Sequence, residues 1–191
     1  MTKINSICVY CGSSSGNNPD YVQSANRLGQ LLAEAGITLV YGGGTSGIMG
    51  TIARAVKSNG GKVVGIIPDF LIKKEARNKN DDLFDEFIVT ETMHQRKQLM
   101  FDRSDAFLAL PGGIGTLEEI VEIMTWAQLG RHTKPIAFAN IDGFYNPMIA
   151  LLDHMARQGF IHSNHKLKPL VIDDIEKIVT AISRNQESHP L

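Results

Sequence analysis

The chain has 191 residues, of which 43% are hydrophobic and 20% are charged, and its formal net charge is −1. This length and composition favour one domain with a sizeable core. The near-neutral charge gives no electrostatic reason to expect a nucleic acid or an anionic membrane as a partner. No apolar run reaches the roughly 18 residues of a membrane span, and no signal peptide is recognisable at the N-terminus. We therefore expect a cytoplasmic protein.

Strands and helices are predicted to alternate along most of the chain. Short apolar runs predict strands at 4–10, 37–41, 62–67, 87–89, 106–110, 135–139 and 171–172. Apolar residues at helical spacing predict helices at about 19–35, 47–58, 92–103, 116–129, 142–157 and 173–183, the last capped by an aspartate. Segment 69–85 is the least regular and is expected to contain some helix, and 162–169 is expected to be a loop.

This alternation predicts an α/β fold with a doubly wound parallel sheet and helices on both faces. A single domain is expected at 1–184, followed by a disordered tail at 185–191. Cys8 and Cys11 have the C-x-x-C spacing of redox motifs. However, Cys8 falls inside the first predicted strand, where residues three apart point to opposite faces, so a disulfide could not close without breaking the strand. We predict two small buried residues instead.

Three of the predicted strands end in loops rich in Gly, Ser and Thr, at 12–16, 42–47 and 112–116. The carboxyl ends of parallel strands meet at one edge of a sheet, where ligands bind. Glycine lets the backbone come close to a ligand, and the free N–H groups of a helix start favour an anion. Together the three loops predict a pocket for a phosphorylated ligand.

The loop at 42–47 also fits the dinucleotide fingerprint G-x-G-x-x-G, but it lacks the lysine of a P-loop. About 20 residues further on, where a ribose-binding acid is expected, the chain is apolar and only then reaches Asp69. An NAD-dependent dehydrogenase is therefore a poorly supported alternative. His162 and His165 have no third ligand nearby in the sequence, so no metal site is predicted.

Two charged residues lie close to the predicted anion pocket. Arg96 shares a helix face with Met93 and Met100, and the spacing leaves open whether its guanidinium reaches solvent or an anion. Glu119 lies one turn into the helix after the third loop, where a simple phosphate site would not favour a carboxylate. Thr116 and Glu119 also fit a capping box, which is the favoured interpretation from local sequence alone, with a functional carboxylate left open.

Residues 111–119, P-G-G-I-G-T-L-E-E, resemble the PGGxGTxxE motif of the LONELY GUY (LOG) family of cytokinin-activating phosphoribohydrolases, which are also labelled lysine decarboxylases. Residues 93–97, M-H-Q-R-K, resemble its second motif, and 11–14 and 41–44 resemble its phosphate loops. The similarity covers about 4–183. It implies a Rossmann-like homodimer that hydrolyses the N-glycosidic bond of N6-prenylated AMP or AMP, releasing base and ribose 5-phosphate without a metal or cofactor.

The resemblance also implies residue roles. Arg96 and Glu119 correspond to the catalytic pair. Substrate contacts are expected from the other matching positions, which are Ser13, Gly42, Gly43, Gly44, Thr45, Glu75, Met93, Lys97, Gly112, Gly113, Ile114, Gly115, Thr116, Glu118 and Thr125. Glu119 would stabilise the positive charge that develops on the ribose, and Arg96, which stays protonated, would position the nucleotide and Glu119.

Two further functions were weighed against this one. Amino-acid decarboxylation needs an electron sink such as pyridoxal phosphate, and no motif for one is recognisable. A nucleotide- or cofactor-binding protein without catalysis, like the molybdenum-cofactor carriers of related fold, stays an alternative that a hydrolysis assay would decide.

Overall fold

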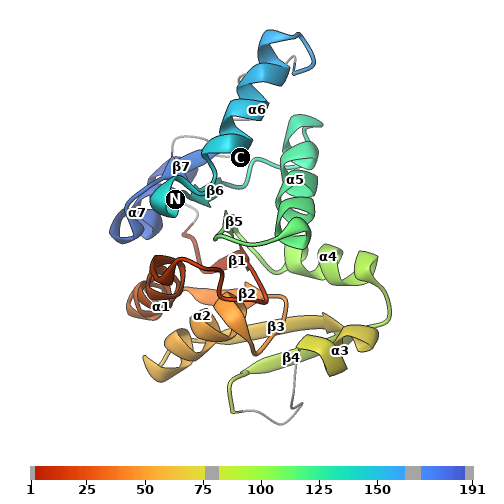
Figure 1. The fold of residues 1–191 in the computed structure, drawn as a ribbon. Helices are drawn as coiled ribbons and strands as arrows, with labels where there is room; N and C mark the ends of the chain where they lie inside the picture. The colour runs from red at the N-terminus through yellow and green to blue at the C-terminus, as the bar shows by residue number, and fades with distance from the viewer. Residues whose placement is uncertain (1–2, 76–81, 162–168, 188–191) are drawn as a thin grey trace.

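A seven-stranded parallel sheet forms the centre of the computed structural model, which describes residues 3–75, 82–161 and 169–187 (Figure 1). The strands are β1 Ser6–Tyr10, β2 Thr38–Tyr41, β3 Val63–Pro68, β4 Glu86–Thr90, β5 Ala106–Ala109, β6 Ile136–Ala139 and β7 Leu170–Ile172. Every side chain of β5 and β6 is buried, as the uniformly apolar runs predicted for strands covered on both faces.

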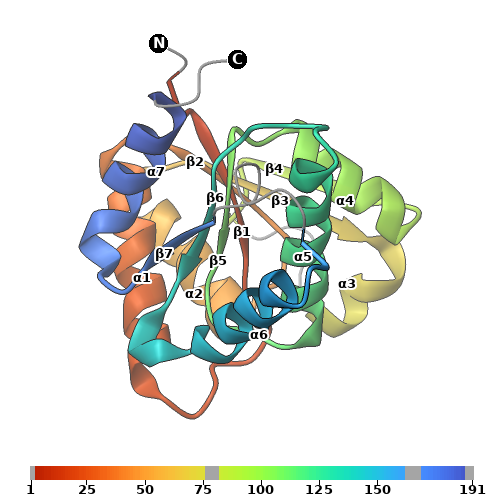
Figure 2. The same cartoon turned by 90° about the horizontal axis from the view of Figure 1, so that it is seen from above.

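Helices cover both faces of the sheet, which confirms the predicted doubly wound fold. They are α1 Pro19–Glu34, α2 Gly47–Ser58, α3 Asp69–Glu75, α4 Met93–Asp102, α5 Ile114–Gln128, α6 Asn146–Arg157 and α7 Ile178–Glu187, with short 3-10 turns η1 Ile141–Gly143 and η2 Ile175–Lys177. Figure 2 shows α1, α2 and α7 on one side of the sheet and α4, α5 and α6 on the other. On each side of the sheet, the apolar side chains of the helices and the strands pack into one buried cluster.

The strand order is β4-β3-β2-β1-β5-β6-β7, so the chain adds strands on one side of β1 up to β4 and on the other side from β5 onward. The chain first builds outward from β1 to β4, then returns to the centre and builds outward from β5 to β7. The crevice of a doubly wound sheet opens at such a reversal, beyond the carboxyl ends of the strands. The loops that follow β1 and β5 therefore lie on either side of the expected binding crevice.

Several predicted boundaries differ from the structure. In segment 69–85 the first part forms helix α3, and 76–81 lie outside the described residues. The final helical segment starts later than predicted, and an aspartate caps it as predicted, since the Asp174 side chain accepts from the backbone N–H of Glu176. Helix α7 continues to Glu187, beyond the predicted start of the tail. The predicted loop at 162–169, with His162 and His165, falls almost wholly outside the described residues, as do 188–191.

The two cysteines are free and buried, as predicted, and they belong to apolar clusters on opposite faces of the sheet. Burial raises the pKa of both thiols, which keeps them protonated and unreactive. A redox role for the C-x-x-C spacing is therefore unsupported.

None of the helices within 3–75, 82–161 and 169–187 is both long enough and apolar enough to cross a membrane. The cytoplasmic location stays a prediction from the sequence.

Candidate active site

Helix α5 begins at the glycine-rich loop after β5 and presents unused backbone N–H groups there. Its N-cap is Gly113, in an extended conformation with φ −94 and ψ −156. The first bond across the helix start runs from the N–H of Leu117 to the carbonyl of Gly113 at 3.1 Å. In the described part of the chain, the N–H groups of Ile114, Gly115 and Thr116 donate to no acceptor. Three amides at a positive helix end form an anion site.

The capping box predicted for Thr116 and Glu119 is wrong. Because Gly113 caps the helix, Thr116 is its third residue and Glu119 its sixth, where the backbone N–H is already inside the helix. The turn before the helix is closely packed, since a Cβ on Gly112 would lie 2.2 Å from Thr116 Oγ1 and 2.9 Å from the backbone nitrogen of Gly12. The Glu119 carboxylate is therefore available for another role.

The three glycine loops lie together, as predicted, but they do not all offer amides to a ligand. The N–H of Gly12 donates to the carbonyl of Pro111 at 3.1 Å, which joins the loops after β1 and β5. At the start of α2, the N–H of Ile48 donates to Ser14 O at 3.4 Å and that of Met49 to Gly12 O at 3.1 Å. These α2 amides are used to hold the first loop, so the start of α5 carries the anion site.

Arg96 is buried, with only 3% of its surface exposed, so the solvent-reaching alternative is wrong. Its Nε donates to Ile66 O at 3.0 Å and its Nη2 to Gly42 O at 3.1 Å, while Nη1 lies 3.8 Å from Met93 Sδ. The guanidinium thus spans the ends of β2 and β3. A side chain on Gly42 would displace this guanidinium, because a Cβ would lie 2.0 Å from Arg96 Nη2.

Glu119 faces this guanidinium from α5 and is 6% exposed. Its Oε1 lies 3.9 Å from Arg96 Nη1, at the long end of an ion pair. Burial raises the pKa of Glu119 from 4.5 to about 7, although Arg96 acts to lower it. A buried carboxyl group that titrates near neutral pH beside a fixed cation is typical of a catalytic site.

Lys97 points from α4 to α5. Its Nζ donates to Glu118 Oε1 at 2.6 Å and to Glu122 Oε1 at 3.2 Å. Partial burial alone would lower the pKa of Lys97, but the hydrogen bonds to the two carboxylates outweigh it and raise the pKa. A lysine that forms a Schiff base needs a lowered pKa, so this ammonium is poorly suited to decarboxylase chemistry.

Glu75, at the end of α3, contacts the loop after β2. Its carbonyl accepts from the Thr45 N–H at 2.8 Å and from Thr45 Oγ1 at 3.3 Å. Its side-chain Oε2 is buried and has no hydrogen-bond partner among the described residues. A buried acceptor without a partner is a candidate contact for a polar ligand group.

Two predicted contact residues lie at the margin of the site or away from it. Ser13 is exposed in the loop after β1, with its carbonyl against Gly47. Thr125 is exposed on α5 and donates to Val121 O at 2.8 Å. It follows Thr116 by nine residues, which is about 13 Å along a helix. Within one chain, Thr125 is therefore distant from the anion site.

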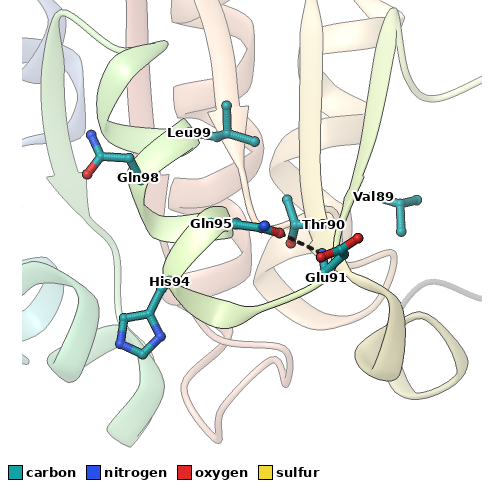
Figure 3. A pocket seen from close by; sticks show the side chains of 7 residues that line it. All are labelled: Val89, Thr90, Glu91, His94, Gln95, Gln98 and Leu99. Atoms are coloured by element: carbon teal, nitrogen blue, oxygen red, sulfur yellow. Dashed lines mark hydrogen bonds between the residues drawn. The ribbon is translucent and has the colours of Figure 1, made fainter.

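A groove of about 680 Å³ lies between β4 and the outward face of α4, and Figure 3 shows its lining. The Glu91 N–H donates to Gln95 Oε1 across one end of it. The lining consists of Val89, Thr90, Glu91, His94, Gln95, Gln98 and Leu99. Neither Arg96 nor Glu119 belongs to it, so this groove is separate from the site around these two residues.

Sequence reasoning missed Tyr145, whose hydroxyl donates to Leu110 O at 2.7 Å, directly before the loop that starts α5. The two residues are 35 positions apart, and no local pattern connects them. The available signal was topological, since Tyr145 follows β6, whose carboxyl end lies at the same edge of the sheet as that of β5.

Comparisons with known proteins identify the family of the chain. Residues 49–182 match the family model described as "Possible lysine decarboxylase". The chain is 48% identical over 157 residues to "Cytokinin riboside 5'-monophosphate phosphoribohydrolase LOG2" of Arabidopsis thaliana, covering 82% of this chain and 72% of the relative. It is 46% identical over 166 residues to the "Probable cytokinin riboside 5'-monophosphate phosphoribohydrolase LOGL9" of Oryza sativa subsp. japonica, covering 87% and 72%.

Among solved structures, the molybdenum cofactor binding protein of Rippkaea orientalis has a TM-score of 0.68 at 24% identity, covering 96% of this chain and 98% of that one. This likeness shows a shared fold and no more. The sequence matches are far closer, and with the paired motifs at Arg96 and Glu119 they show that the chain belongs to the LOG family.

Proposed function

We propose that the protein hydrolyses the N-glycosidic bond of a nucleoside 5'-monophosphate and releases the free base and ribose 5-phosphate. The observation that carries this proposal is the buried Glu119 carboxyl group, which faces Arg96 and lies about one helix turn beyond three free amides. The names of the plant relatives, which are cytokinin riboside 5'-monophosphate phosphoribohydrolases, support the same reaction.

In this mechanism the amides of Ile114, Gly115 and Thr116 bind the 5'-phosphate, which places the ribose over the next turn of α5. Breaking the C–N bond builds positive charge on the sugar, as in glycoside hydrolysis. Ionised Glu119 stabilises this cation and orients the water that adds to the ribosyl carbon, and the departing base takes up the proton that this water loses. Arg96 stays protonated and holds its hydrogen bonds to Gly42 O and Ile66 O, so it positions Glu119 and transfers no proton.

Glu75 is assigned to the base side of the site. Its Oε2, which has no hydrogen-bond partner within the described part of the chain, can accept a hydrogen bond from an exocyclic amino group. Adenine has two such N–H donors and an N6-prenylated adenine retains one, so one acceptor serves both bases. AMP and N6-prenylated AMP therefore both remain candidate substrates, and a comparison of their turnover distinguishes them.

The test of the proposed function is base release from a panel of nucleotides. We expect AMP or N6-prenylated AMP to be cleaved at least about a hundredfold better in kcat/KM than the matching nucleoside, because the phosphate supplies binding energy remote from the reacting bond. Adenosine 3'-monophosphate is the control, since it carries the same charged group at the wrong position. Comparable cleavage of AMP and adenosine would contradict the mechanism, and nucleotide binding without base release would indicate a non-catalytic binding protein.

We also propose a homodimer formed through α5 and α6. Apolar side chains that are exposed in the single chain follow one face of α5, and others lie on α6, which stands beside α5 in Figure 1. They are Ile114, Leu117 and Val121 on α5, Leu129 directly after it, and Leu151 and Met155 on α6. Thr125 lies on the same face of α5, so a two-fold contact there brings it toward the site of the second copy.

The dimer is tested with Val121→Asp. Burying an unpaired carboxylate in an apolar contact is costly, so we expect the dimer to weaken by about a hundredfold or more, seen as a monomer by light scattering at micromolar concentration. Val89→Asp is the matched control, because Val89 is 43% exposed and Val121 is 40% exposed, but Val89 lies on β4. A Val121→Asp variant that stays as dimeric as the control would contradict this interface.

A further inference from the structure

The turn that leads into α5 has few anchors. The peptide between Leu110 and Pro111 contains a single hydrogen-bonding group, the Leu110 carbonyl, because proline has no N–H. That carbonyl accepts from Tyr145 Oη at 2.7 Å. The next carbonyl, of Pro111, accepts from the Gly12 N–H at 3.1 Å. The N–H of Leu110 also donates to Tyr10 O at 2.9 Å. Tyr145 thus supplies the side-chain contact to a turn that two backbone hydrogen bonds also hold, directly before the free amides.

Tyr145 is itself held firmly. It is 5% exposed, its ring centroid lies 4.8 Å from that of Phe138, and its backbone N–H donates to Asn140 Oδ1 at 2.8 Å. Asn140 Nδ2 in turn donates to Asn146 Oδ1 at 2.9 Å and to Asp173 Oδ1 at 2.8 Å. Burial raises the pKa of Tyr145, so the phenol keeps the proton that it donates. This network extends from the ends of β6 and β7 to the end of β5.

We infer that Tyr145 is a positioning residue that holds the phosphate-binding turn at the start of α5. Without its hydroxyl, Leu110 O becomes a buried acceptor that has lost this donor, and the turn is free to relax. The amides of Ile114, Gly115 and Thr116 then lose their fixed direction. Arg96 and Glu119 rest on other contacts, with Gly42, Ile66 and each other, so the chemical step is spared.

The test is Tyr145→Phe, which removes one oxygen atom and keeps the ring. This inference rests on the proposed function for its ligand. The first measurement is therefore the binding of ribose 5-phosphate, detected by the rise in melting temperature that the bound ligand causes. We expect the Kd for ribose 5-phosphate and the KM for AMP each to increase about tenfold, with kcat changed by about twofold or less. Ile182→Val is the control, since Ile182 is fully buried in α7 on the opposite face.

The control should lower the melting temperature without changing either constant, as a purely structural substitution does. If Tyr145→Phe is also less stable but binds ribose 5-phosphate like the unmodified protein, the positioning role is wrong. The same conclusion follows if the unmodified protein does not bind ribose 5-phosphate. If it binds ribose 5-phosphate, loses that affinity in Tyr145→Phe and yet does not cleave AMP, the proposed reaction is wrong and the role of Tyr145 stands.

Discussion

Glu119→Gln is expected to lower kcat by roughly 10²–10³ while making the folded protein more stable at neutral pH. The amide has nearly the shape of the carboxyl group, so the nucleotide should still bind at the start of α5. It carries no negative charge, however, and the ribosyl cation loses its counter-charge. Turnover and nucleotide affinity measured on one preparation separate these two effects. Normal turnover would leave the proposed mechanism without its central residue.

The gain in stability follows from the pKa of Glu119, which burial raises from 4.5 to about 7. The folded protein therefore holds this proton more tightly than the unfolded chain does. The stability that the folded protein gains from this tighter proton binding is fully present below pH 4.5 and is lost as the pH rises through about 7. The difference between the pKa values of Glu119 in the folded and unfolded states corresponds to a loss of roughly 3 kcal/mol in the free energy of unfolding at pH 8. Because glutamine cannot ionise, the Glu119→Gln variant does not lose this stability as the pH rises.

Urea unfolding at two pH values measures the effect. We expect the free energy of unfolding of Glu119→Gln to exceed that of the unmodified protein by up to about 3 kcal/mol at pH 8 and to match it at pH 4. Glu118→Gln is the control, because Glu118 is an exposed neighbour that pairs with Lys97 and should show no comparable gain. A Glu119→Gln variant that is less stable at pH 8 would contradict the costly burial of the charge.

The fold could be predicted largely because its signals are local. The uniformly apolar runs at β5 and β6 identified strands covered on both faces, and alternation with helical periodicity implied a parallel doubly wound sheet. The glycine loops were placed correctly at the carboxyl ends of β1, β2 and β5 for the same reason, since each directly follows a strand signal. The motifs around Arg96 and Glu119 then indicated which loop would be functional.

The parts of the site that the sequence left open or misassigned depend on contacts between distant segments. The pattern at Thr116 and Glu119 fits a cap, but the helix starts earlier, after a turn whose Pro111 carbonyl accepts from the distant Gly12 N–H. The direction of Arg96 is decided by the carbonyls of Gly42 and Ile66, 54 and 30 positions away. Helical spacing contains no information about either acceptor, so sequence periodicity could not decide between solvent and site.

Arg96→Met is expected to lower kcat/KM by roughly 10²–10³ in a folded protein. Methionine fills much of the same volume beside Met93 but cannot bond Gly42 O or Ile66 O. Arg96 also acts to lower the pKa of Glu119, so removing its charge should raise that pKa further. Because the mechanism requires ionised Glu119, the remaining activity should rise with pH at higher values than in the unmodified protein. An unchanged pH profile with normal turnover would contradict this assignment.

Gly42→Ala tests the same contact from the opposite side. A Cβ on Gly42 would lie 2.0 Å from Arg96 Nη2 and 3.2 Å from its Cζ, so the guanidinium has to move. We expect a loss in kcat/KM of about 10² for this substitution alone, but at most about threefold when it is added to Arg96→Met, because the displaced group is then absent. Losses that multiply in the double variant would mean that Gly42 acts on the nucleotide directly. Losses that do not multiply would show that Gly42 matters because it makes room for Arg96 beside Glu119.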